Sequence, residues 1–127
     1  MAVSQVVITS PAPEVIFTDN AMGAIVDTVK TSNGIVYYVT VDNSLNTLVP
    51  SYVKLYFALA ANVTIGSTVP NDVIYVAARA KETRRYLTGA AFGRTFPVAL
   101  SALCVTTGGT FGSISPTNPV QVTISYM

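Results

Sequence analysis

The sequence predicts an all-β fold, an antiparallel β-sandwich of immunoglobulin-like or jelly-roll-like type with seven to eight short strands. Three observations lead to this prediction. Val, Thr and Ile make up about a third of the 127 residues, and β-branched side chains suit a pleated, half-buried surface. Gly, Pro and Asn clusters recur between short alternating segments. Half of the residues are apolar and only 10% are charged, which excludes a disordered chain and fits one domain over 1–127.

The beginning of the chain is predicted to be extended. Residues 3–9 read as a short extended segment, and "SPAPE" at 10–14 follows with two prolines that disfavour a helix. We therefore expect residues 1–13 to form an N-terminal arm or an edge segment. This beginning has neither a basic region nor a long apolar run, so we expect no signal peptide.

Residues 21–30 fit two interpretations. Met22, Ile25, Val26 and Val29 have helical spacing, but Gly23, the β-branched residues and the following "SNG" favour a strand over 24–31. "SNG" at 32–34 is typical of a hairpin turn, because Asn-Gly accepts positive φ angles.

The rest of the chain is predicted to consist of strands and turns. In 35–42, strict alternation places Ile35, Tyr37, Val39 and Val41 on one face. In 51–59, Lys54 faces away from Val53 and Leu55. The expected strands are 35–42, 51–59, 73–78, 83–88, 98–107 and 120–127, with loops at 43–50, 64–72, 89–97 and 108–119.

The residues that carry most enzyme chemistry are missing or isolated. The chain contains no histidine, and its six carboxylates form no D-x-D or E-x-x-E pair. Cys104 has no neighbouring base, so we expect it to pack in the core. The glycine-rich loop 106–112 lacks the lysine and the helix of a phosphate-binding loop. Asp42-Asn43-Ser44 has an incomplete calcium spacing and reads better as an Asx-turn. The sequence thus predicts no catalytic, cofactor or metal site.

Charge is distributed unevenly along the chain. The stretch 79–94 carries five basic side chains and Glu82, whereas the remaining charges sum to −3 and all acids among them precede residue 73. The stretch reads as a solvated edge strand or as a protein interface that pairs head-to-tail with the acidic half of another copy. A nucleic-acid interface is disfavoured by the pI of about 7.8, and no apolar run is long enough to cross a membrane. The candidate interface residues are Arg79, Lys81, Arg84, Arg85 and Arg94.

Four segments carry a resemblance to a known group of proteins. They are "GIVYYVTVDNS", "YVKLYFALAANVTIGSTVPNDVIYV", "FPVALSALCVTTGGT" and "TNPVQVTISY". In their order, these segments resemble the small all-β virion structural proteins of tailed bacteriophages, of the head decoration or cement type. The stretch "VAARAKETRR" departs from this group by its higher charge.

The resemblance implies a structural rather than an enzymatic role. The implied function is a decoration or cement protein that binds and stabilises the head shell as a homo-oligomer, dimer or trimer. The implied partners are the major capsid protein or other virion proteins, without nucleic acid, membrane or cofactor. With one cysteine and no signal peptide, we expect synthesis in the host bacterial cytoplasm and a final location in the virion. The alternative function is a tail-fibre, baseplate or other adhesion module that binds the host surface.

Overall fold

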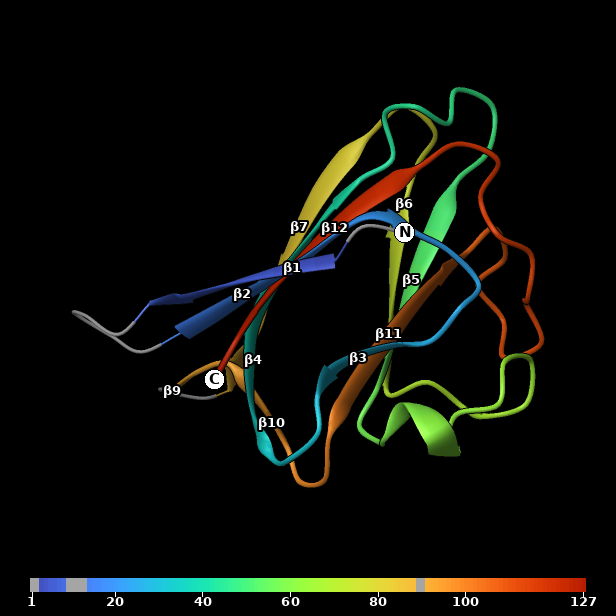
Figure 1. Cartoon of the computed structure of the whole chain (residues 1–127). Coiled ribbons are helices and arrows are strands. Elements are labelled where there is room, and N and C mark those ends of the chain that lie inside the picture. Colours follow the sequence, from blue (N-terminus) through green and yellow to red (C-terminus); the bar gives the residue numbers. More distant parts are fainter. Residues whose placement is uncertain (1–2, 9–13, 89–90) are drawn as a thin grey trace.

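The predicted antiparallel β-sandwich is confirmed by the structure, a computed structural model that describes residues 3–8, 14–88 and 91–127 (Figure 1). Two sheets pack face to face with the main hydrophobic core between them. The described residues form twelve strand segments and one 3-10 helix, η1 (Ala60–Asn62). The strands are β1 (Val3–Ile8), β2 (Glu14–Met22), β3 (Asp27–Lys30), β4 (Gly34–Asp42), β5 (Ser51–Tyr56), β6 (Asp72–Val76), β7 (Lys81–Arg85), β8 (Leu87–Thr88), β9 (Ala91–Phe92), β10 (Arg94–Phe96), β11 (Leu100–Val105) and β12 (Val120–Tyr126).

The strands divide into two main sheets, and all of their pairs are antiparallel. Sheet A has the order β1-β2-β12-β4-β10, and β7 also pairs with β4. Sheet B has the order β3-β11-β5-β6, and β8 and β9 form a separate two-stranded sheet. Strand β1 is thus the edge strand of sheet A next to β2, and it comprises residues 3–8 of the segment 1–13. The rest of the predicted arm, residues 1–2 and 9–13, lies outside the described residues.

The expected number of seven to eight strands is too low for two reasons. Strand β2 is missing from the sequence prediction, because Asp19 and Asn20 interrupt the apolar pattern of "EVIFTDNAM". Segments β8, β9 and β10 contain only two or three residues each and were expected to be part of a strand or a loop.

The connection at 32–34 is not the predicted hairpin. Strand β3 pairs with β11 in sheet B, whereas β4 pairs with β12 in sheet A, so the chain crosses between the sheets here. Asn33 does not have the positive φ of a tight hairpin turn; among described non-glycine residues only Arg79 does. Position 34 requires glycine for a different reason, because there is no room for a side chain. A Cβ at this position would lie 2.1 Å from the Met127 carbonyl oxygen and 2.8 Å from Phe96 Cζ.

A bulge at Tyr37 shifts the predicted alternation of β4. Across from β12, Ser125 pairs with Tyr38 and Tyr126 pairs with Val36, which leaves Tyr37 as an extra residue. Val36 therefore joins Val39 and Val41 in the core, although strict alternation places it on the opposite face.

Sheet B is covered on both faces, which explains why β11 is buried along its whole length. Ala102 and Cys104 belong to the main core between the sheets. Leu103 and Val105 belong to a second cluster on the outer face, with Tyr56 from β5 and Val63 after η1. The predicted core position of Cys104 is confirmed, and burial raises the pKa of its thiol to about 12.

Lys54 faces the outer side of sheet B, away from Val53 and Leu55 as expected, but it is fully buried. Its Nζ donates hydrogen bonds to the carbonyl oxygens of Gly109 and Gly112, at 2.6 and 3.1 Å. Burial lowers the pKa of this amine. The glycine-rich loop 106–112 therefore covers a lysine of the same chain with its carbonyl groups.

We predict that Gly34→Ala lowers the free energy of unfolding by about 1–3 kcal/mol, because the new methyl group overlaps backbone and ring atoms that are held by the core. Gly109→Ala is the matched control, since a Cβ there meets nothing within 4 Å. Urea unfolding followed by circular dichroism measures both. Equal stability of the two variants would contradict the close approach at Gly34.

Candidate functional site

The five predicted basic residues lie along one side of sheet A. Lys81, Arg84 and Arg85 belong to β7 and Arg94 to β10, two strands that pair with the same edge of β4. Arg79 lies in the preceding turn, where its backbone N–H donates to the Asn46 carbonyl oxygen. The structure thus places these residues along one edge of the sheet, and β7 is exposed throughout, as expected for a solvated edge strand.

Three of these basic side chains already contact groups of their own chain. Arg84 forms an ion pair with Asp72 at 3.0 Å, and the Tyr86 hydroxyl donates to the same carboxylate at 2.6 Å. The guanidinium of Arg94 lies 4.8 Å from the centre of the Phe57 ring, and that of Arg85 lies over Tyr38. These contacts fix β7 and β10 against neighbouring strands.

The acidic residues offer little surface to a second copy. Asp19 and Asp27 are buried, and Glu14 accepts a hydrogen bond from the Ser125 hydroxyl. Asp72 pairs with Arg84. Asp42 lies opposite Lys81 in the β4–β7 register. The acidic side chains that the predicted head-to-tail charge pairing would use are therefore buried or already bound within their own chain.

The sequence did not reveal a buried amide network at the end of the sandwich where β4 leads into β5. Asn43 is fully buried, and its Nδ2 donates to the carbonyl oxygens of Val49 and Ala77, at 3.2 and 3.1 Å. Its Oδ1 accepts from the Ser51 hydroxyl at 2.7 Å and from Asn46 Nδ2 at 3.0 Å. The side chain thus joins the 43–50 loop to the end of β6 and the start of β5.

Asn46 extends this network to the connection before β12. Its Nδ2 donates to the Asn118 carbonyl oxygen and its Oδ1 accepts from the Asn118 N–H, both at 3.0 Å. The Ser44 N–H donates to Asp42 Oδ1, which confirms the predicted Asx-turn. An Asx-turn was the only sequence signal here, because the partners of Asn43 and Asn46 lie on distant segments.

Four exposed apolar side chains surround the segment 115–119, which this network holds in place. We call them the loop surface: Ile25, Leu45, Leu48 and Val49. Each of the four lines one of three shallow hollows beside the segment. Leu48 is the most exposed of them, at 87%.

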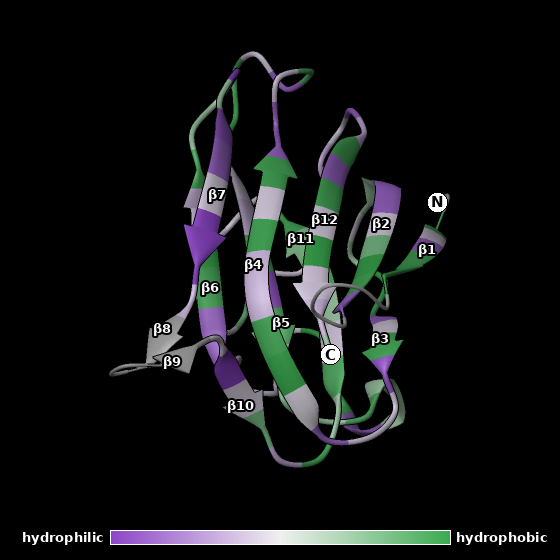
Figure 2. Cartoon of the chain, turned by 90° about the vertical axis from the view of Figure 1, so that its left-hand side faces the viewer, coloured by the Kyte–Doolittle hydropathy of each residue, from purple (hydrophilic) through white to green (hydrophobic). Residues whose placement is uncertain are grey.

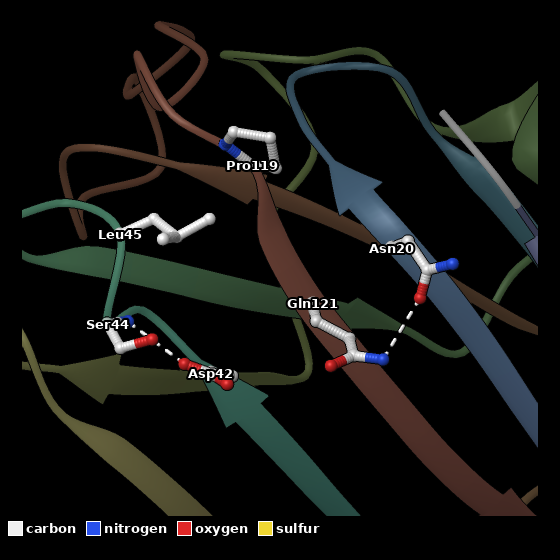
Figure 3. Close-up of a pocket in the computed structure, with 6 residues that line it drawn as sticks. All are labelled: Asn20, Asp42, Ser44, Leu45, Pro119 and Gln121. Carbon is white, nitrogen blue, oxygen red and sulfur yellow. Dashed lines mark hydrogen bonds between the residues drawn. The ribbon is translucent and has the colours of Figure 1, made fainter.

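One of the hollows combines this apolar rim with polar groups (Figure 3). It has a volume of about 230 Å³, and Leu45 and Pro119 form its apolar part. Its polar part is fixed by two hydrogen bonds, Gln121 Nε2 to Asn20 Oδ1 at 3.0 Å and the Asx-turn of Asp42. The lining residues are Asn20, Asp42, Ser44, Leu45, Pro119 and Gln121.

A pair of buried carboxyl groups lies between the sheets. Asp19 belongs to β2 of sheet A and Asp27 begins β3 of sheet B. Burial, followed by the hydrogen bond and charge of Asp19, raises the pKa of Asp27 to about 8. When both are ionised, Oδ2 of each has no donor among the described residues. A proton on Asp27 supplies a donor at this position, and the raised pKa of Asp27 keeps that proton bound at neutral pH.

We predict that stability falls as the pH rises from about 5 to about 8, with a slope that approaches about 1.4 kcal/mol per pH unit. The folded state binds the Asp27 proton in this range and the unfolded state does not, so the stabilisation is complete below the unfolded pKa and is lost through the folded pKa. No histidine titrates in the same range. Urea midpoints across this range should become nearly constant in Asp27→Asn and keep their slope in the control Asp42→Asn. A wild-type midpoint that rises with pH would contradict the raised pKa of Asp27.

We also predict that Asn43→Ala lowers the free energy of unfolding by about 2–4 kcal/mol, because it leaves buried carbonyl and hydroxyl groups without partners. Asn20→Ala, at an exposed position, should change it by less than about 0.5 kcal/mol. Amide exchange in the Asn43→Ala variant should also accelerate in 43–50 and 115–119 before the rest of the chain. Uniform acceleration would argue against a local role for the network.

Comparisons with known proteins assign no family. No family model matches the chain, and no curated protein matches its sequence significantly. Within the described residues, no three Cys, Asp or Glu side chains are grouped as a metal ion would require. None of the described helical segments has the length and apolar character of a membrane span.

Proposed function

We propose that this protein is a structural component of a tailed-bacteriophage virion, a decoration or cement protein that binds and stabilises the head shell. The proposal combines the sequence resemblance with one structural observation, the loop surface. Four large apolar side chains are exposed around one segment at one end of the sandwich. Several large exposed apolar side chains around one segment of a small protein are typical of a contact surface for another protein.

The loop surface is suited to binding because its frame is already ordered. Asn43 and Asn46 fix the 43–50 loop, and Asn118 ties it to the segment that carries Pro116 and Pro119. A fixed surface loses little conformational entropy on binding, which favours affinity. The surface also carries few charges, so contact with the major capsid protein requires little desolvation of ionised groups.

A second candidate function is an adhesion module of a tail fibre or baseplate. The hollow in Figure 3 favours it, because amide and carboxylate groups of Asn20, Asp42 and Gln121 border an apolar wall. Planar polar groups of this kind hydrogen-bond to sugar hydroxyls. The lining contains no aromatic ring on which a sugar could stack, which favours the first candidate.

We predict that gold-labelled antibody against this protein marks the heads of phage particles and that each particle contains hundreds of copies, about one per few shell subunits. Leu48→Asp should abolish rebinding to heads from which the protein has been removed, because it places a charge on the loop surface at its most exposed apolar side chain. Val69→Asp, at a highly exposed valine outside the loop surface, is the control and should rebind. Label on the tail with a few copies would support the adhesion module instead.

A further inference from the structure

The two outer edges of sheet A differ in their protection against pairing with other strands (Figure 2). On one side, β7 carries Lys81, Glu82, Arg84 and Arg85 among its five exposed residues. Charged residues on an edge strand prevent other strands from adding to it. On the other side, β1 has the sequence VSQVVI and contains no charge and no proline.

Strand β1 is also regular and exposed. Its register with β2 runs without a bulge from the pair Val3–Asp19 to the pair Ile8–Glu14. Val6 is 57% exposed and Val7 is 66% exposed, although they point to opposite faces of the sheet. Gln5 fixes the strand to its own sandwich, since its Nε2 donates to the Tyr126 hydroxyl at 3.0 Å. The strand therefore presents a preformed, apolar and unprotected edge.

We propose that β1 pairs antiparallel with β1 of a second copy across a two-fold axis, so that two sheets A join into one continuous sheet. An uncharged strand suits this occupant, because self-pairing of a charged strand would place like charges opposite each other. Pairing of β1 with β7 of another copy would be head-to-tail, and the charges of β7 disfavour it. The two-fold pair closes after two copies.

The symmetry restricts the register of this pair. A two-fold axis perpendicular to the joined sheet leaves the core-facing side of both copies on the same side of that sheet. Directly opposed side chains point to the same side, so the two opposed residues must be an even number of positions apart in the sequence. The register centred on Gln5 pairs Val3 with Val7 on the core-facing side and Ser4 with Val6 on the outer side. The alternative centred on Val6 sets Gln5 against Val7 and keeps only the self-pair of Val6. We therefore assign the register centred on Gln5, which pairs the exposed Val3 and Val7 of each copy with those of the other copy.

This inference specifies the homo-oligomer of the proposed function but does not depend on the phage role, because its test uses the purified chain alone. Sedimentation equilibrium should give a dimer at micromolar concentration for the wild type. The double variant Ser4→Lys/Val6→Lys should be monomeric under the same conditions, because the assigned register sets the two lysines of one copy opposite those of the other. Its near-ultraviolet circular dichroism spectrum should be unchanged, because residues 4 and 6 are exposed in the single copy. Val69→Lys is the control and should remain dimeric. A monomeric wild type, or a dimeric double variant, would overturn the proposal and leave the shell-binding test unaffected.

Cysteine cross-linking tests the register. The double variant Ser4→Cys/Val6→Cys should form a covalent dimer on mild oxidation, because directly opposed residues bring their Cβ atoms to about the distance that a disulfide requires. Each single variant should not, since neither residue opposes itself. The native Cys104 is buried and does not compete. A covalent dimer from the Val6→Cys single variant would overturn the register centred on Gln5.

Discussion

The loop end of this sandwich depends on the buried amide of Asn43. Where strands leave a sheet, their carbonyl groups lose their ladder partners and need donors from elsewhere. Asn43 supplies them to Val49 and Ala77, and it accepts from Ser51 and Asn46 in turn. One side chain therefore fixes the start of β5, the end of β6 and, through Asn46, the segment before β12. The positions of the exposed apolar residues on these loops follow from it.

Several of the few charges of the chain are engaged within the molecule. Lys54 binds the carbonyl groups of the loop over sheet B, Asp72 binds Arg84 and Tyr86, and Asp19 and Asp27 meet between the sheets. Buried charged groups are stable only when paired or neutralised, and Lys54 has carbonyl partners while Asp27 has a raised pKa that keeps it protonated. The exposed charges are concentrated on β7. The rest of the surface is poor in charge, because the chain contains few charged residues.

The sequence predicts local structure better than connections in this protein. Strands β5, β6, β11 and β12 appear where their apolar patterns place them, because period-two alternation depends only on neighbouring residues. The Asn-Gly at 33–34 led to a wrong hairpin prediction. Gly34 is needed because Met127 and Phe96, from distant parts of the chain, lie too close for a side chain there. The roles of Asn43 and of the Asp19–Asp27 pair could not be predicted for the same reason, because their partners are brought together only by the tertiary fold. The basic edge could be predicted, because its residues lie close in sequence.

The positions of the loop surface and of β1 determine where the two loop surfaces lie in a β1-paired dimer. The loops of the surface lie at the ends of the strands, whereas β1 lies at the side of sheet A (Figures 1 and 2). Because paired strands run antiparallel, the two loop surfaces of the dimer lie at opposite ends of the joined sheet. If the protein has the proposed role, one such dimer reaches two separate sites along a shell, with its sheet lying between them. This two-ended geometry suits a protein that strengthens junctions between shell subunits better than it suits a module with a single adhesion site.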